Sequence, residues 1–343
     1  MRKLWWLLAA TAAIPAAGVI YQVLTEQADR RRYSKTGRVV RVGSKSLYVK
    51  DVMSGLQDAG FGATIVFESG IGATSHNWTG IQRAVAGEAR TFSYDRAGLG
   101  WSTGPAALTT PKSLAGQLRA LLSAAGVPPP YLLVAHSFGG LVARQFAAAS
   151  PAEVVGLVLV DPMRAEDWPP LNPAQAAFVA RGIRLARAGR MAARFGLTRL
   201  FMGSTLLGSA RLARVLCRIG GEPVQNLMDR MLCEVGKMPR EVWPSVVANW
   251  SRPEFFRTLE SYLTSVPQAV EETLRLEPLG VPVLVLTPAT ATPLSDSQLR
   301  DLGTGARQVF ADNSAHWVHL DEPELVLNAI REMFSRAATS PHA

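Results

Sequence analysis

Short apolar runs alternate with longer amphipathic segments along most of the chain. The runs at Thr64–Phe67, Tyr131–Ala135 and Val154–Val160 contain almost no polar side chain. Strands of this kind are buried on both faces, as in parallel sheets covered by helices. Helical periodicity follows at Ser113–Ala125 and Phe138–Ala149. The alternation predicts βαβ units, and therefore an α/β fold whose mostly parallel central sheet has helices on both faces. Further strands are expected at Arg38–Val42, Ser46–Lys50, Thr91–Tyr94, Pro282–Leu286 and Gln308–Phe310.

The alternation of strands and helices stops at Asp161 and resumes near Val281. Between these points the pattern is helical and strand signals are nearly absent. This predicts a helical insertion between the sixth and seventh main strands. We therefore expect an α/β core formed by residues 38–162 and 278–338, and an inserted helical cap, or lid, formed by residues 163–277.

The first 37 residues are predicted to be a membrane anchor followed by a basic linker. No charged side chain occurs from Leu4 to Leu24, and a helix of that length, at about 1.5 Å per residue, matches a hydrocarbon core about 30 Å thick. A cleaved secretory signal, which would make the protein secreted, has a shorter apolar region and is less favoured. Basic residues flank both ends, so the side of the membrane is left open.

Composition excludes several classes of protein. The chain has 343 residues, of which 48% are hydrophobic and 18% charged. Glycine and proline are scattered without a period, which excludes disordered, collagen-like and solenoid proteins. The two cysteines, Cys217 and Cys233, lack metal-site spacing and are interpreted as core thiols, with a disulfide between them left open.

The net charge of +9 lies mostly in the predicted cap, where residues 164–275 contain 16 basic and 10 acidic side chains. Five of the arginines recur at helical spacing. Beside a membrane anchor, such a helix could dock on anionic headgroups and admit lipidic substrates, or it could be an ordinary solvated helix face. No nucleic-acid partner is expected, because no known binding motif accompanies the arginines. The five arginines at helical spacing are Arg181, Arg184, Arg187, Arg190 and Arg194.

The sharpest chemical signal is the segment 135–140, with the sequence AHSFGG. It joins a buried strand to a helix and has small residues on both sides of Ser137. Such a tight turn holds a serine in a strained backbone conformation and exposes its Oγ above the sheet, as in a nucleophile elbow. Ser137 is therefore the candidate nucleophile. The competing interpretation is a serine-glycine turn that merely starts a helix.

The order of motifs resembles the α/β-hydrolase superfamily, particularly its lidded, membrane-anchored bacterial members, over about residues 38–162 and 278–335. The resemblance implies an α/β-hydrolase fold. Segment 93–102, SYDRAGLGWS, is similar to the family's D-x-R-G-x-G-x-S turn. This similarity implies that Asp95 supports the site structurally and is not itself catalytic.

The same resemblance points to a base. Segment 314–321, SAHWVHLD, is similar to the family's S-G-H-x-x-x-x-D segment after the last strand. It aligns His316 with the catalytic base and His319 with a hydrogen-bonded supporting position. His136 adjoins the nucleophile, where strand alternation should aim its side chain elsewhere.

The triad carboxylate is the open point. The family usually carries an aspartate shortly after the seventh strand, but segment 287–293 has none. Asp161, directly after the sixth strand, and Asp296, further along, are the two candidates for fixing the imidazole tautomer. We favour Asp161. Alternatively, Asp161 only caps the turn into the cap, a common role for aspartate before proline.

An oxyanion hole requires two backbone N–H groups aimed at the developing charge. One is expected from Phe138, after the nucleophile, and the other from Ile71 in the loop 69–72, SGIG, where Ser69 replaces the family's histidine. Alternatively the glycines only form a turn. A phosphate site is not favoured, because no P-loop lysine follows.

These residues together predict a serine hydrolase that cleaves a carboxylic ester or related acyl bond through an acyl-enzyme, without a metal or an organic cofactor. The substrate is expected to be a small acyl compound. Ser137 differs from the aspartate that haloalkane dehalogenases and epoxide hydrolases carry at this place. The alternative is a catalytically idle binding or sensory protein on the same fold.

Overall fold

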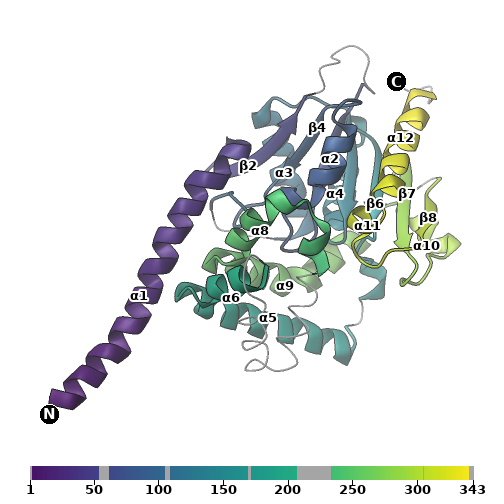
Figure 1. Ribbon diagram of the computed structural model, residues 1–343. Coiled ribbons are helices and arrows are strands. Elements are labelled where there is room, and N and C mark those ends of the chain that lie inside the picture. The colour runs from purple at the N-terminus through teal and green to yellow at the C-terminus, as the bar shows by residue number, and fades with distance from the viewer. Residues whose placement is uncertain are drawn as a thin grey trace.

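The fold is built around one eight-stranded sheet (Figure 1). The computed structural model describes residues 2–53, 62–104, 109–168, 171–206, 233–303 and 305–339. The strand order is β1-β2-β4-β3-β5-β6-β7-β8. The two pairs made by β2 are antiparallel, and the remaining pairs are parallel. The strands are β1 (Arg38–Val42), β2 (Lys45–Val52), β3 (Thr64–Glu68), β4 (Thr91–Tyr94), β5 (Tyr131–His136), β6 (Val154–Val160), β7 (Val283–Pro288) and β8 (Arg307–Ala311).

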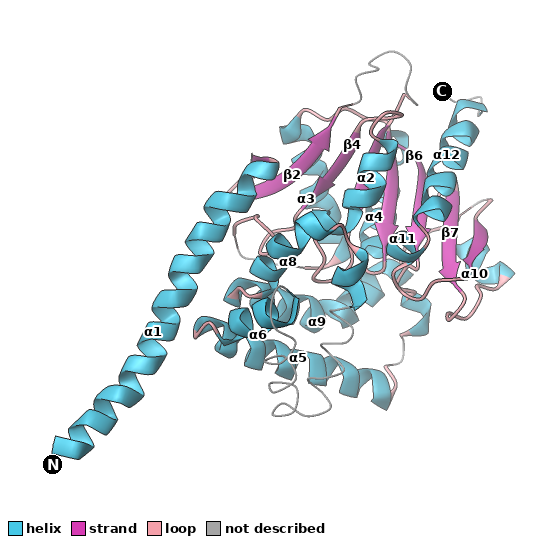
Figure 2. Ribbon diagram, viewed as in Figure 1, coloured by secondary structure: helices cyan, strands magenta, loops and turns pink. Residues whose placement is uncertain are grey.

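Helices cover both faces of the sheet (Figure 2). Along β5, Leu133 and Ala135 belong to the core beneath α3 and α4, while Leu132 and Val134 belong to the core beneath α2 and α12. This alternation is the period-two geometry of a strand buried on both sides. The predicted α/β fold with helices on both faces is confirmed. The covering helices are α2 (Thr79–Val85), α3 (Pro111–Ala125), α4 (Gly139–Ala149) and α12 (Pro323–Thr339), and the shorter α10 (Asp296–Leu302) and α11 (Val318–Asp321) flank β8.

Between β6 and β7 the described residues form helices and no strand, and Figure 1 shows these helices gathered at one end of the sheet. Helix α5 packs closely on α9, because a Cβ added at Gly182 or Gly189 would meet Leu263 or Phe256 at less than 3.0 Å. We refer to this insertion as the cap. Its main helices are α5 (Pro173–Arg194), α6 (Leu197–Leu206), α8 (Trp243–Trp250) and α9 (Pro253–Leu274), with one-turn helices η4 (Ala165–Asp167) and η5 (Arg240–Val242).

The N-terminal residues form one long helix, α1 (Arg2–Tyr33), which projects as a rod in Figure 1. Within the described ranges, no helix is both long and apolar enough to cross a bilayer. The prediction of a single N-terminal membrane anchor is therefore wrong. The expected basic linker is also helical up to Tyr33, so the apolar segment and the charged segment belong to the same element.

Contacts with the cap give the physical reason for this correction. Gln22, inside the expected span, is 2% exposed and donates a hydrogen bond to the Ser251 carbonyl at 3.1 Å. Arg199 of α6 donates to Gln22 Oε1 and to the Asp29 carboxylate. Arg252 pairs with Glu26 at 3.0 Å. The later part of α1 thus has polar partners on the protein, which the apolar pattern alone does not reveal.

The arginine-rich helix of the cap is α5. Arg187 and Arg190 both pair with Glu260 of α9, at 2.6 Å and 3.5 Å. Part of the basic face is therefore neutralised within the cap. Docking on a membrane surface was one of the two interpretations of this helix. It depended on a membrane anchor beside the helix, and without the anchor it has no support.

Candidate active site

A cavity of about 280 Å³ lies between the sheet and the cap. All five residues predicted for the site line it, together with side chains of α5 and α9 such as Phe178 and Leu263. The structure therefore brings residues that are distant in sequence to one cavity with a largely apolar wall on the cap side. The five are Ile71, Ser137, Phe138, Asp161 and His316.

Ser137 occupies the turn between β5 and α4. Its φ of 53° lies in the left-handed region, which is uncommon for a residue with a side chain. The neighbouring glycines are required by close contacts, because a Cβ at Gly139 would lie 2.7 Å from the carbonyl oxygen of Glu68. The segment thus has the tight strand–serine–helix geometry expected of a nucleophile elbow.

Asp161 occupies a second strained turn, at the end of the adjacent strand β6, with a φ of 40°. The two turns are joined by main-chain hydrogen bonds. The Ser137 N–H donates to the Val160 carbonyl at 3.1 Å, and the Met163 N–H donates to the Ser137 carbonyl at 3.0 Å. The Asp161 N–H donates to the Leu286 carbonyl of β7 at 2.8 Å. Backbone bonds of neighbouring strands therefore set the spacing of the two turns.

His316 Nδ1 lies 2.7 Å from Asp161 Oδ2. A neutral imidazole that donates from Nδ1 keeps Nε2 as its basic nitrogen. Asp296, the alternative acid, lies exposed at the start of α10 and is not among the residues that line the cavity. Of the two candidate carboxylates, Asp161 is the one in contact with the histidine.

His136 is a buried neighbour of the site that sequence reasoning missed. Its Nε2 lies 2.8 Å from the His316 carbonyl oxygen, and the two rings are 4.6 Å apart. Burial lowers the pKa of His136 well below its ordinary value, and the nearby His319 and His316 lower it further, so the ring is neutral and donates from Nε2. As predicted, the alternation of side chains along β5 directs His136 away from Ser137. It points to the face of the sheet where α11 and the segment that carries His316 pack.

His319 packs beside His136 and Trp78, with ring centroids 4.5 Å from each. Neither of its ring nitrogens has a hydrogen-bond partner among the described residues. Burial lowers its pKa to about 3, with smaller effects of His316 and Lys237. His319 supports the site by packing, and the expected hydrogen-bonded role is wrong.

Arg96 holds the loop that follows β3. Its side chain donates to the Glu68 carboxylate and to the main-chain carbonyls of Ser69 and Gly70. In a trans peptide the C=O and N–H point in opposite directions. The Gly70 carbonyl, which is turned toward Arg96, therefore directs the N–H of Ile71 in the same peptide group away from the guanidinium. A Cβ at Gly70 would lie 3.4 Å from Ser137 Cβ, so this loop touches the nucleophile turn.

Asp95, next to Arg96, is buried and does not line the cavity. Its carboxylate accepts hydrogen bonds from the N–H groups of Ser75 and Trp101, both at 2.9 Å. Gly100 is required beside it, because a Cβ there would overlap Asp95 Oδ2. This arrangement is that of a structural support for the turn.

A buried carboxyl group from the cap, Glu234, responds to the charge of His316. It accepts a hydrogen bond from Asn77 Nδ2 at 2.8 Å. Burial raises the pKa of Glu234 from 4.5 to about 7, while the Asn77 hydrogen bond and the charge of His316 lower it. No sequence motif marks Glu234, so no pattern in the chain could have found it.

The cysteine prediction is only partly covered by the structure. Cys233 is exposed, which does not fit a core thiol. Cys217 lies outside the described residues.

Comparison with known proteins places the chain in a family. A family model described as "alpha/beta hydrolase fold" matches residues 63–323. The Bacillus subtilis protein YqjL is 41% identical over 101 residues, which is 29% of this chain and 40% of YqjL. The chain therefore spans less than half the length of this relative.

Solved structures share the fold. The epoxide hydrolase CorEH has a TM-score of 0.64 and 17% identity, with 88% of this chain and 99% of that chain covered. A thermophilic esterase from Thermogutta terrifontis has a TM-score of 0.58 and 19% identity, with the same coverage of both chains. The family match extends from β3 to the start of α12 and includes every residue of the cavity described above. The chain belongs to the alpha/beta hydrolase fold family.

Proposed function

We propose that this protein is a serine hydrolase that cleaves a carboxylic ester or a related acyl bond. The observation that carries the proposal is the 2.7 Å contact between His316 Nδ1 and Asp161 Oδ2, at the cavity that Ser137 also lines. A carboxylate in this position fixes the tautomer of the base and stabilises its protonated form. Family membership supports a hydrolase, and the serine at the strained turn supports acyl transfer through a covalent intermediate.

In the proposed first step, His316 Nε2 takes the proton of Ser137 Oγ as Oγ attacks the carbonyl carbon. The π electrons move to the carbonyl oxygen, which the backbone N–H groups of Phe138 and Ile71 stabilise. The leaving alcohol departs with the proton from His316. Water then loses a proton to His316 and attacks the acyl-enzyme, which releases the acid and restores Ser137.

The cavity suggests the class of substrate. Its volume of about 280 Å³ is near the lower end of the range for small-molecule sites. Trp168, Phe178, Leu263 and Val266 supply apolar contacts from the cap. We therefore expect esters with a short or medium apolar acyl group. The sharing of a fold with an esterase is compatible with this, whereas Ser137 does not fit the aspartate that epoxide hydrolases carry at this place.

The test is covalent labelling of the full chain by a fluorophosphonate probe, read as the gain in intact mass. Wild-type protein is expected to gain one probe, and Ser137→Ala to gain none. Asp161→Asn should slow both labelling and ester hydrolysis, on the order of 10³- to 10⁴-fold for hydrolysis, because the imidazole tautomer is no longer fixed. The matched control is Asp296→Asn, at the other candidate acid, which should retain the wild-type rate.

Two outcomes would contradict the proposal. If folded wild-type protein takes up no probe, the binding or sensory alternative gains support. If Asp296→Asn slows labelling and Asp161→Asn does not, the assignment of the acid is wrong.

A further inference from the structure

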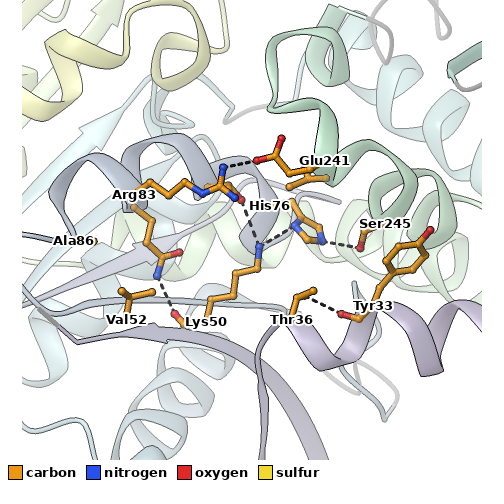
Figure 3. A pocket seen from close by; sticks show the side chains of 12 residues that line it. Tyr33, Thr36, Lys50, Val52, His76, Arg83, Ala86, Glu241 and Ser245 are labelled. Atoms are coloured by element: carbon orange, nitrogen blue, oxygen red, sulfur yellow. Dashed lines mark hydrogen bonds and ion pairs between the residues drawn. The ribbon is translucent and has the colours of Figure 1, made fainter.

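A second cavity, of about 370 Å³, lies between the core and the cap (Figure 3). Of the described residues, none lines both this cavity and the one at Ser137. Its walls come from β2, η2 (Ser75–Trp78) and α2 of the core, from η5 and α8 of the cap, and from the end of α1. Three regions of the chain, the end of α1, the core and the cap, therefore meet around it.

Lys50 of β2 extends into this cavity, as Figure 3 shows. Its Nζ lies 2.9 Å from His76 Nδ1 and 3.4 Å from Thr79 Oγ1. It makes no ion pair with any carboxylate in the described part of the chain. An ammonium has three N–H donors. These two contacts leave one N–H and an unneutralised charge facing the cavity.

The hydrogen bonds around His76 leave Ser245 as a donor. Because Lys50 donates to Nδ1, the proton of the neutral imidazole is on Nε2, which lies 2.7 Å from Ser245 Oγ. Burial, and secondarily the charge of Lys50, keep His76 neutral by lowering its pKa well below the ordinary value. Trp101 Nε1 also donates to Ser245 Oγ, at 3.0 Å. Since the Ser245 oxygen accepts both bonds, its own hydrogen remains available.

Three other polar side chains of the cavity are already paired. Gln82 donates to the Lys50 carbonyl at 3.0 Å and accepts from Ser93 at 2.9 Å. Arg83 and Glu241 form an ion pair with each other. The Lys50 ammonium and the Ser245 hydroxyl thus each keep a hydrogen for a ligand in the cavity, and both are donors.

We propose that this cavity binds a small organic monocarboxylate, with its carboxylate against Lys50 and Ser245 and its apolar part against Val52, Ala86 and Val242. A carboxylate is an acceptor with two oxygens, so it can accept from both remaining donors and compensate the ammonium charge. The other two charged side chains of the wall, Arg83 and Glu241, already pair with each other, which favours a ligand with a single ionised group.

Charge at Lys50 should control the affinity. Burial lowers the pKa of Lys50 from 10.5 to about 8, with Asp95 and Glu241 raising it and Arg83 lowering it. His76, the remaining titratable neighbour, stays neutral. Binding should therefore weaken as the pH rises through this value and Lys50 loses its proton.

The test is isothermal titration calorimetry of the full chain with hexanoate, and with hexanamide as the uncharged match. Hexanoate is expected to bind, at least about tenfold more tightly than hexanamide and at least about tenfold more tightly at pH 7 than at pH 9.5. Lys50→Met should lose at least about tenfold in affinity. Lys45→Met is the matched control, because Lys45 lies on the same strand outside the cavity, and it should bind as the wild type does.

Ser245→Ala gives an independent check if Lys50→Met fails to fold, and it should weaken hexanoate binding by severalfold. Equal binding by Lys50→Met and wild type, or by hexanamide and hexanoate, would overturn the proposal. Binding of inorganic phosphate in preference to hexanoate would show that the class of anion is wrong. None of these measurements depends on hydrolysis, so they are independent of the function proposed for Ser137.

Discussion

Arg96 is a single residue on which both the core and the candidate site depend. Its side chain is 3% exposed and that of its partner Glu68 is 1% exposed. Tyr94 also donates to Glu68, at 2.6 Å. Removing one member of a buried ion pair leaves the other charge uncompensated, which costs far more than removing both.

Arg96→Met is therefore expected to lower the free energy of unfolding by about 3 to 5 kcal/mol. Urea denaturation measures this change. The double variant with Glu68→Leu should be less destabilised than Arg96→Met alone. In contrast, Arg275→Met removes an exposed pair with Glu271 and should change stability by less than about 1 kcal/mol. Equal losses for Arg96→Met and Arg275→Met would refute this view of the buried pair.

Single residues also show what the sequence could and could not predict at the site. Ser137 was predictable because a tight turn between a buried strand and a helix has a local signature. The sequence favoured Asp161 over Asp296 but could not decide between them, because the choice depends on which strand end the imidazole approaches. His136 was missed for the same reason, since its partner is a main-chain carbonyl that lies 180 residues later.

At the scale of elements, the strands of the sheet were the most predictable part. Val154–Val160 was predicted with the bounds that the structure shows, and Tyr131–Ala135 differs from β5 by one residue. Burial on both faces removes polar positions from these strands, so they stand out in the sequence. Helix α1 was misread, because its apolar run says nothing about the polar contacts that Gln22 makes with the cap.

The contact between α1 and the cap depends on Gly196, between α5 and α6. Its φ is +72°, and a Cβ there would lie 2.7 Å from the Tyr21 ring of α1. Gly196→Ala should therefore destabilise the protein and loosen α1, so that trypsin cleaves faster at Arg30–Arg32. Limited proteolysis followed by mass spectrometry measures the rate.

The control for this substitution is Gly203→Ala in α6, where an added Cβ meets nothing within 4 Å among the described residues. Alanine favours helix by about 1 kcal/mol over glycine, so this variant should be as stable as wild type or more stable. If both variants are cleaved at the wild-type rate, Gly196 does not hold α1 in place.

At the scale of the whole molecule, polar contacts join the core to the cap. One of these contacts involves a carboxyl group whose pKa is shifted. Glu234 of the cap contacts Asn77 of the core, and burial raises its pKa to about 7. The folded state therefore keeps this proton at pH values where the unfolded chain has released it. The resulting stability is full below about pH 4.5 and is lost as the pH rises to about 7. The shift of the Glu234 pKa corresponds to about 3 kcal/mol in the free energy of unfolding.

Glu234→Gln keeps an acceptor for Asn77 but cannot ionise. Relative to wild type, this variant should gain up to about 3 kcal/mol of stability between pH 4.5 and pH 8, as measured by urea denaturation at both values. Glu277→Gln makes the same chemical change at an exposed position and is the matched control. A pH-independent effect of Glu234→Gln would mean that the pKa of Glu234 is the same in the folded and unfolded states.

The main-chain bonds that join the turns at Ser137 and Asp161 make this architecture modular. These bonds involve β5, β6 and β7. One of them is donated by the N–H of Met163, where the cap begins, to the Ser137 carbonyl. The spacing of the proposed nucleophile and acid is therefore set by strands of the core that lie on either side of the cap in sequence. A recombination event, or a designed chimera, that exchanges residues after Met163 and before β7 would bring a new substrate wall while inheriting the two turns intact.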